Sequence, residues 1–165
     1  MVKNWKRGPL ISAGLLLGIG LGGFLDGIVF HQILQTHNML SNRIPVDSLV
    51  NAKINMTWDG YFHAMVWLIT VIGVYRLFSA ARRDDALWSG QLLFGAWLTG
   101  WGLFNLVEGI INHHVLALHH VMEYAIDKQP YDLAFLASGV FFVLIGWLFI
   151  RAGSRDDDVT WHTRG

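Results

Sequence analysis

The amino-acid sequence predicts an all-α membrane protein in which four transmembrane helices form a two-plus-two bundle with pseudo-twofold symmetry. Four apolar stretches each approach the roughly 20 residues that a helix needs to cross a bilayer. The chain also repeats itself, because residues 8–37 align without a gap on residues 90–119. Composition agrees with a membrane class, since 53% of the residues are hydrophobic and 15% are charged. We therefore expect one membrane domain over residues 1–165.

Hydropathy marks the four expected spans at residues 10–30, 62–78, 87–107 and 133–150. Each is expected to be a helix, because lipid offers the backbone no water to bond to. The first stretch follows Lys3, Lys6 and Arg7 as a signal peptide would. It is long and shows no clear small-residue cleavage site, so we interpret it as a span.

Basic residues concentrate on one side of these spans. That side holds Lys3, Lys6, Arg7, Arg76, Arg82, Arg83, Arg151, Arg155 and Arg164, and the other side holds Arg43, Lys53 and Lys128. The positive-inside rule then predicts that both termini are cytoplasmic, in the inner membrane of a bacterium. Residues 153–165 are expected to be a polar cytoplasmic tail.

The repeat predicts an internal duplication. Eleven of the thirty positions in residues 8–37 are identical to their partners 82 residues later. Two histidine pairs recur in register, His31 with His113 and His37 with His119, and Asp26 aligns with Glu108. The second spans align at an offset of 73, which matches Asp59 with Asp132. We assign repeat 1 to about residues 8–80 and repeat 2 to about residues 87–152, with the pseudo-twofold axis along the membrane normal.

Small residues give the first span a seam for close helix packing. Gly14, Gly18 and Gly22 recur every four residues, and Asp26 is the next position on the same face. A carboxylate near the bilayer core costs about 2.5–3.5 kcal/mol on insertion scales, so Asp26 and Glu108 need partners. The histidines at the same end of the bundle are the obvious partners.

The inferred topology gathers histidines and carboxylates at the extracytoplasmic end. The candidate metal ligands are Asp26, His31, His37, Asp59, His63, Glu108, His113, His114, His119 and Asp132. Asp59 and His63 are four residues apart, so one helical face is expected to present both to a single ion. Bundle interiors that receive such side chains from several helices can hold dinuclear centres.

Two spacings conflict with a regular helix. His31 points about 140° away from Asp26 on an ideal helix, and Asp26 and His37 are separated by roughly 16 Å in height. Gly27 and Gly109 directly follow the two carboxylates. We expect a bulge of the helix at these glycines, which would bring each carboxylate closer to its histidine.

The donor types limit the cofactor. The chain has no cysteine, which leaves nitrogen and oxygen ligands and favours copper, iron or zinc over calcium or magnesium. Met39, Met56, Met65 and Met122 lie near the same end and tilt the choice toward copper, although methionine is also an ordinary gap filler. Haem held by two histidines is a further alternative.

These observations leave several functions open. The first is a redox or hydrolytic metalloenzyme, with a respiratory-chain or other electron-transfer partner, and the second is a copper or zinc handling protein for assembly of a respiratory oxidase. A structural polar network and a homo-oligomer are also compatible with the sequence. The formal net charge of zero disfavours nucleic acid, so the expected partner is the lipid bilayer. Ion transport ranks last, because the cytoplasmic halves of the first and third spans are almost wholly apolar.

The motifs resemble those of a bacterial membrane family called domain of unknown function 2243. The resemblance rests on residues 24–28 (FLDGI), residues 31–35 (HQILQ), Asp59 with Gly60, and residues 108–114 (EGIINHH). It covers nearly the whole chain and implies a membrane topology. It implies no activity, so the functional prediction depends on the residues themselves.

Overall fold

The computed structural model describes residues 5–153, and these residues are helical without a strand. The predicted cytoplasmic tail lies outside them except for Gly153. The elements are α1 (Gly8–Asp26), η1 (Gly27–Ile33), α2 (Leu49–Ala81), α3 (Gly90–Glu108), η2 (Gly109–Val115) and α4 (Gln129–Gly153), where η denotes a π-helix.

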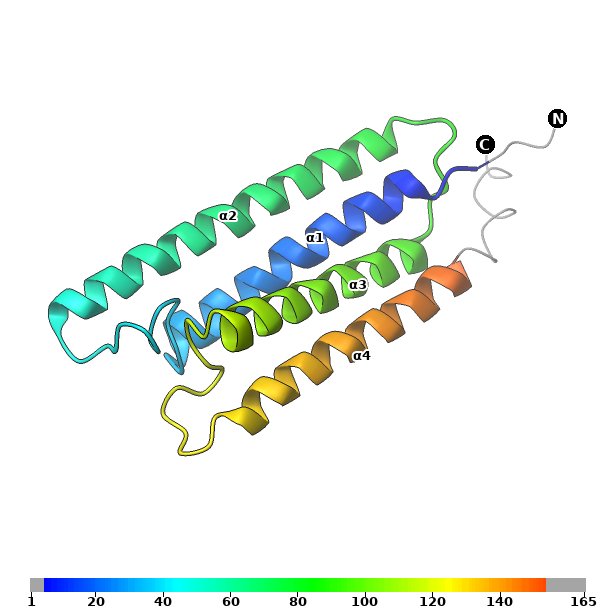
Figure 1. Ribbon diagram of the computed structural model, residues 1–165. Coiled ribbons are helices and arrows are strands. Elements are labelled where there is room, and N and C mark those ends of the chain that lie inside the picture. The colour runs from blue at the N-terminus through cyan, green and yellow to red at the C-terminus, as the bar shows by residue number, and fades with distance from the viewer. Residues whose placement is uncertain (1–4, 154–165) are drawn as a thin grey trace.

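The four long helices lie side by side in the order α2, α1, α3, α4 (Figure 1). Neighbours in this row pack against one another, and α1 and α3 form the central pair. The chain enters α1 and α3 from the same end, whereas α2 and α4 run in the opposite direction. The ends of α1 and α3, with η1, η2 and two long connections, are therefore brought together at one end of the row.

Serine residues cap the N-termini of two helices, α2 and α3. Ser48 accepts a hydrogen bond from the backbone N–H of Asn51, and Ser89 accepts one from Leu92, as capping residues do. The predicted start of the second span at residue 62 was therefore too late, because α2 begins at Leu49. Polar residues such as Asn55 and Asp59 lower the hydropathy of this segment without interrupting the helix.

Three helical segments are long and apolar enough to cross a membrane by length and composition. They are Gly8–Ile33, which joins α1 to η1, Leu49–Ala81 and Gln129–Gly153. α3 is not among them, because residues such as Thr99 and Asn105 lower its hydropathy. It nevertheless has the same length as α1, 19 residues, and packs between α1 and α4.

The predicted glycine seam lies in the contact between α1 and α3. A methyl group on Gly18 would lie 2.0 Å from the carbonyl oxygen of Trp97, and one on Gly100 would lie 2.2 Å from that of Leu15. Only glycine permits this approach, because the atoms in the way belong to backbone. The two helices are thus close enough for their last residues, Asp26 and Glu108, to share one site.

Ion pairs tie the opposite end of the row together. Lys6 Nζ lies 3.0 Å from Asp85 Oδ2, and Arg83 Nε lies 2.9 Å from Asp85 Oδ1. These two cations lower the pKa of Asp85 to about 2, so its carboxylate remains charged at neutral pH. The segment before α1 is thereby joined to the connection between α2 and α3.

Candidate metal centre

The helix bulges predicted at Gly27 and Gly109 are present, as longer π-helical segments. η1 and η2 are each seven residues long and begin directly after Asp26 and Glu108. A π-helix turns less per residue than an α-helix and brings residues five apart onto one face. His31 therefore lies on the same side as Asp26, with its Nε2 atom 3.3 Å from Asp26 Oδ2.

After each π-helix the chain reverses direction and brings a second histidine close to the carboxylate that precedes the π-helix. Gln35 and Ala117 have positive φ angles of 51° and 45°, and these residues are 82 positions apart. The reversal places His37 Nε2 4.0 Å from Asp26 Oδ2, although a regular helix would hold the two far apart. His119 reaches Glu108 in the same way, with 3.5 Å between Nε2 and Oε1.

These contacts define two half-sites, each with one carboxylate and two histidines. The first half-site contains Asp26 with His31 and His37, which lie 3.3 and 4.0 Å from its carboxylate. The second contains Glu108, His113 and His119, whose ligand atoms all lie within 4.8 Å of one another. All six residues are at most 4% exposed. We refer to them together as the histidine–carboxylate cluster.

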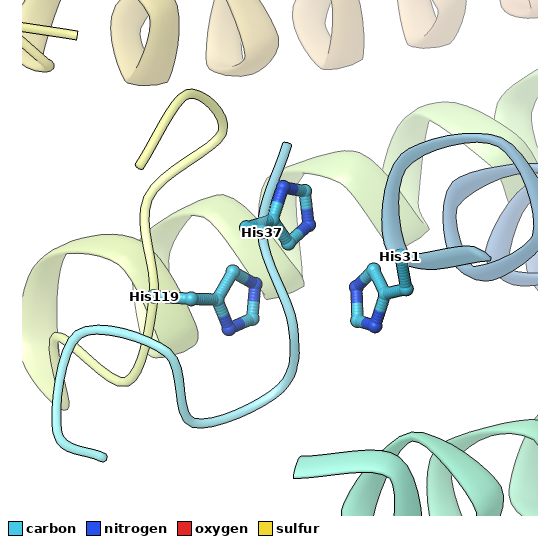
Figure 2. A group of neighbouring side chains, drawn as sticks. All are labelled: His31, His37 and His119. Carbon is cyan, nitrogen blue, oxygen red and sulfur yellow. The ribbon is translucent and has the colours of Figure 1, made fainter. Parts of the chain in front are cut away.

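The two half-sites interlock. His37 and His119 stack face to face with their ring centroids 4.6 Å apart, and His31 meets His37 edge on at 4.5 Å. Figure 2 shows these three imidazoles converging from η1 and from the two connections. Ligand atoms of His31, His37 and His119 all lie within 4.8 Å of one another, as do those of Asp26, His31 and Glu108.

Hydrogen bonds on the outer nitrogen hold three of the cluster imidazoles in place. The Nδ1 of His31 lies 2.8 Å from Asp59 Oδ1. His37 Nδ1 donates to the carbonyl of Val121, and His119 Nδ1 donates to the carbonyl of Met39, each at 3.0 Å. A carbonyl can only accept, so in the neutral rings of His37 and His119 the lone pair is on Nε2.

Burial keeps the His37 imidazole neutral, which is the form that binds a metal ion. The pKa of His37 is lowered to about 3, first by the loss of water on burial and then by the neighbouring His119. His37 is therefore neutral at physiological pH and does not need to lose a proton before it binds a cation.

Asp59 and Asp132 support the cluster from α2 and α4. Asp59 also accepts hydrogen bonds from Met39 N and Asn38 Nδ2, each at 2.8 Å. Asp132 accepts from Val121 N at 2.9 Å and lies 3.5 Å from His113 Nδ1. Carboxylates behind a histidine orient the ring and raise its basicity, as in many metal sites.

The unpaired polar atoms of the interior gather in this cluster. Among the described residues, buried side-chain atoms without a hydrogen-bond partner are Asp26 Oδ2, His31 Nε2, His37 Nε2, both Glu108 oxygens, His113 Nδ1 and His119 Nε2. Apart from His113 Nδ1, which faces Asp132, all belong to the inner faces of the half-sites. Native interiors leave few buried polar groups unsatisfied, so a cluster of such atoms is a place where a metal ion could bind.

The spacing of these atoms fits metal coordination. Two donors bound at about 2.1 Å to one ion are separated by no more than about 4.2 Å. The measured separations of 3.3, 4.0 and 3.5 Å within the half-sites meet this limit. Two buried carboxylates also need positive charge to offset them, which a cation supplies.

Two predicted ligands lie outside the cluster. His63 Nδ1 donates to the backbone carbonyl of Asp59, and His114 Nδ1 donates to that of Gly109, each at 2.7 Å. The structure does not bring the Asp59 and His63 side chains together on a common face, because the Asp59 carboxylate is turned toward His31. His114 is exposed.

Two residues outside the predicted site also contact its aspartates, Asn38 and His120. Asn38 binds Asp59, and His120 Nδ1 lies 2.6 Å from Asp132 Oδ2. The two residues are 82 positions apart and support the two aspartates from the returning chain. The repeat aligned them, but the difference between asparagine and histidine hid their common role.

Of three comparisons with known proteins, the one with protein families supports the membrane assignment. Neither a curated protein nor a solved structure matches the chain. One family model, described as a predicted membrane protein family (DUF2243), matches residues 13–153. The match spans most of the described residues, from α1 to the end of α4. The chain therefore belongs to the DUF2243 family of predicted membrane proteins.

Proposed function

We propose that this protein is a membrane metalloprotein with a dinuclear transition-metal centre, held by the histidine–carboxylate cluster and used for redox chemistry. The observation that carries the proposal is the convergence of unpaired, buried nitrogen and oxygen atoms from both half-sites. Each half-site would hold one ion, with Asp26, His31 and His37 as ligands in the first and Glu108, His113 and His119 as ligands in the second. A metal pair bound here would supply one-electron or two-electron chemistry.

The donor set favours iron over copper. Two histidines and one carboxylate form the ligand set of non-haem Fe(II) sites that keep open positions for substrate. In the sequence, the methionines near this end favour copper, but their positions in the structure do not strengthen that choice. Met39 packs with Phe62 and Val66 in an apolar cluster, and Met65 is exposed on α2.

The alternatives account less well for the geometry. A purely structural polar network would join its buried atoms by hydrogen bonds, whereas the cluster nitrogens lie 3.3, 4.0 and 3.5 Å from the carboxylate oxygens without a hydrogen bond between them. Haem would need a porphyrin between two imidazoles, but His37 and His119 stack directly on each other. A handling protein must release its metal, and ligands this deeply buried favour a resident ion.

The membrane arrangement is part of the proposal. We propose that all four helices span the bilayer, that the Lys6–Asp85 end is cytoplasmic and that the cluster lies toward the extracytoplasmic side of a bacterial inner membrane. The supports are the excess of basic residues at the first end and the equal lengths of α1 and α3. An electron partner in the respiratory chain would then meet the protein at or within the membrane.

Elemental analysis of the protein, purified in detergent without a histidine tag, tests the metal site. The His31→Ala/His113→Ala variant removes one ligand from each half-site, and we expect its bound metal to fall to background. The His63→Ala/His114→Ala variant removes two histidines that lie outside the cluster and should keep the wild-type content. Equal metal in both variants, or none in the wild type, would overturn the proposal.

A folding control separates ligand loss from collapse of the bundle. The His31→Gln/His113→Gln variant keeps polar side chains of similar length at both positions. Circular dichroism and gel filtration should match the wild type, while the metal content remains at background. A folded glutamine variant that retains the wild-type metal would exclude these two histidines as ligands.

A further inference from the structure

A groove of about 710 Å³ lies between α2 and α3. The backbones of these two helices are not neighbours, because α1 lies between them in the row, and the Phe62 and Phe104 rings meet across the gap with their centroids 6.1 Å apart. Aromatic rings line much of the groove, including Trp58, Tyr61 and Phe62 from α2 and Phe104 from α3. Its lining suits a flat, apolar ligand.

Two polar side chains stand out in the lining, Glu108 and Asn112. Glu108 also belongs to the histidine–carboxylate cluster, so the groove reaches the candidate metal centre. The side chain is 3% exposed, and neither carboxylate oxygen has a hydrogen-bond partner. The Glu108 carboxylate is thus a buried acceptor without a donor at the inner wall of the groove.

The groove opens toward lipid rather than water. Its flanks include Met65 on α2 and Leu103 and Val107 on α3, which are exposed on helices that we place in the bilayer. Exposed apolar side chains at this depth contact acyl chains. A ligand that enters from this side must therefore dissolve in the membrane.

We propose that the groove binds a lipid-soluble hydroquinone, with its ring among the aromatic side chains and a hydroxyl group at Glu108. This substrate class rests on the proposed function, because Glu108 belongs to the proposed metal centre. A phenolic hydroxyl donates one hydrogen bond and accepts another, which the Glu108 carboxylate and the Asn112 amide can match. The remaining apolar lining accommodates the hydrocarbon tail.

Other membrane amphiphiles fit the groove less well. A fatty acid or phosphate head group would bring a second negative charge to Glu108. An ammonium group has three N–H donors and a high cost of burial, and it would find few acceptors beside this carboxylate. A hydroquinone has a neutral head group and an aromatic ring, so it satisfies both the polar end and the aromatic lining.

Binding of a decyl-substituted hydroquinone to the protein in phospholipid nanodiscs tests the proposal. The Val107→Trp variant places bulk at the mouth of the groove, and we expect it to weaken binding by roughly tenfold or more. The matched control is Val74→Trp, on an exposed part of α2 outside the groove lining, which should bind as the wild type does. Metal content is measured on the same samples.

These readouts separate the groove from the metal. Retained metal with weakened binding in Val107→Trp alone supports the proposal, and hydroquinone binding in a wild type without metal would support the groove while refuting the metal centre. Unchanged binding in Val107→Trp, or an equal loss in Val74→Trp, would overturn it. It is also overturned if native mass spectrometry finds a phospholipid in the groove that the hydroquinone does not displace.

Discussion

His31 shows how a single residue depends on two aspartates. Its Nε2 atom faces Asp26, and its Nδ1 atom is held by Asp59. Phe62 stacks on the ring with centroids 5.5 Å apart, which restricts rotation of the imidazole. The ring is therefore fixed on three sides before any ion binds, and such preorganisation raises metal affinity.

At the residue scale, Asp59→Asn should weaken metal binding while the fold persists. The amide retains an oxygen for the backbone N–H of Met39 but loses the charge that supports His31. Loss of such a partner lowers affinity by about 10–100-fold. A competition titration with a chelator measures the change.

Asp47→Asn is the matched control for this titration. Asp47 is exposed and accepts a hydrogen bond from the Asn51 side chain, well away from the cluster. Its replacement should leave metal affinity unchanged. If Asp59→Asn also bound metal as tightly as the wild type, Asp59 would have no part in supporting the site.

The elements show what the sequence can predict and what it cannot. The pairing of Asp26 with Glu108 and the glycines after them indicated where the helices bulge, because a repeated irregularity leaves a repeated pattern. The turns that bring His37 and His119 back to the cluster could not be predicted. They place positive φ angles at Gln35 and Ala117, whereas a sequence indicates such angles mainly where glycine occurs. The place of His63 outside the cluster could not be predicted, because helical spacing identifies a shared face but not the hydrogen bond between the His63 ring and the Asp59 carbonyl.

At the element scale, Gly18→Ala should separate α1 from α3. The added methyl group would meet the Trp97 carbonyl, which belongs to backbone and cannot move without the whole helix. Overpacking of this kind typically costs about 1–3 kcal/mol. We expect a lower midpoint of thermal unfolding in detergent, together with loss of bound metal.

Gly60→Ala gives the opposite expectation with the same chemical change. Gly60 lies inside α2, and a methyl group there would meet nothing within 4 Å. Alanine is favoured over glycine within a helix by roughly 0.5–1 kcal/mol, so the midpoint should hold or rise. A similar decrease in both variants would contradict the role of the α1–α3 seam.

At the scale of the whole molecule, contacts on the two sides of the α1–α3 interface correspond to one another. His31 stacks on Phe62, and His113 tilts against Phe135 with centroids 5.1 Å apart. The carbonyls of Met39 and Val121 are 82 positions apart in the chain, and each holds the second histidine of the other half-site. These correspondences support the proposed duplication and explain why neither half-site is complete without the other half of the chain.

At the scale of the whole molecule, cysteine labelling tests the orientation. The chain has no cysteine, so a single introduced thiol reports one position. Asp84 lies in the connection between α2 and α3, and the exposed Ile126 lies in the connection before α4. Each is replaced by cysteine in a separate variant. A membrane-impermeant maleimide should label Ile126→Cys in intact cells and Asp84→Cys only after permeabilisation. The reverse pattern would invert the proposed topology.

X-ray absorption at the edge of the bound metal tests the dinuclear centre most directly. We predict nitrogen and oxygen scatterers at about 2.0–2.2 Å, with the outer-shell pattern of imidazole. A second metal should contribute scattering at about 3.5–4 Å, the usual spacing in paired sites. The absence of a metal edge, a shell of sulfur ligands, or an isolated ion without a metal neighbour would contradict the proposed centre.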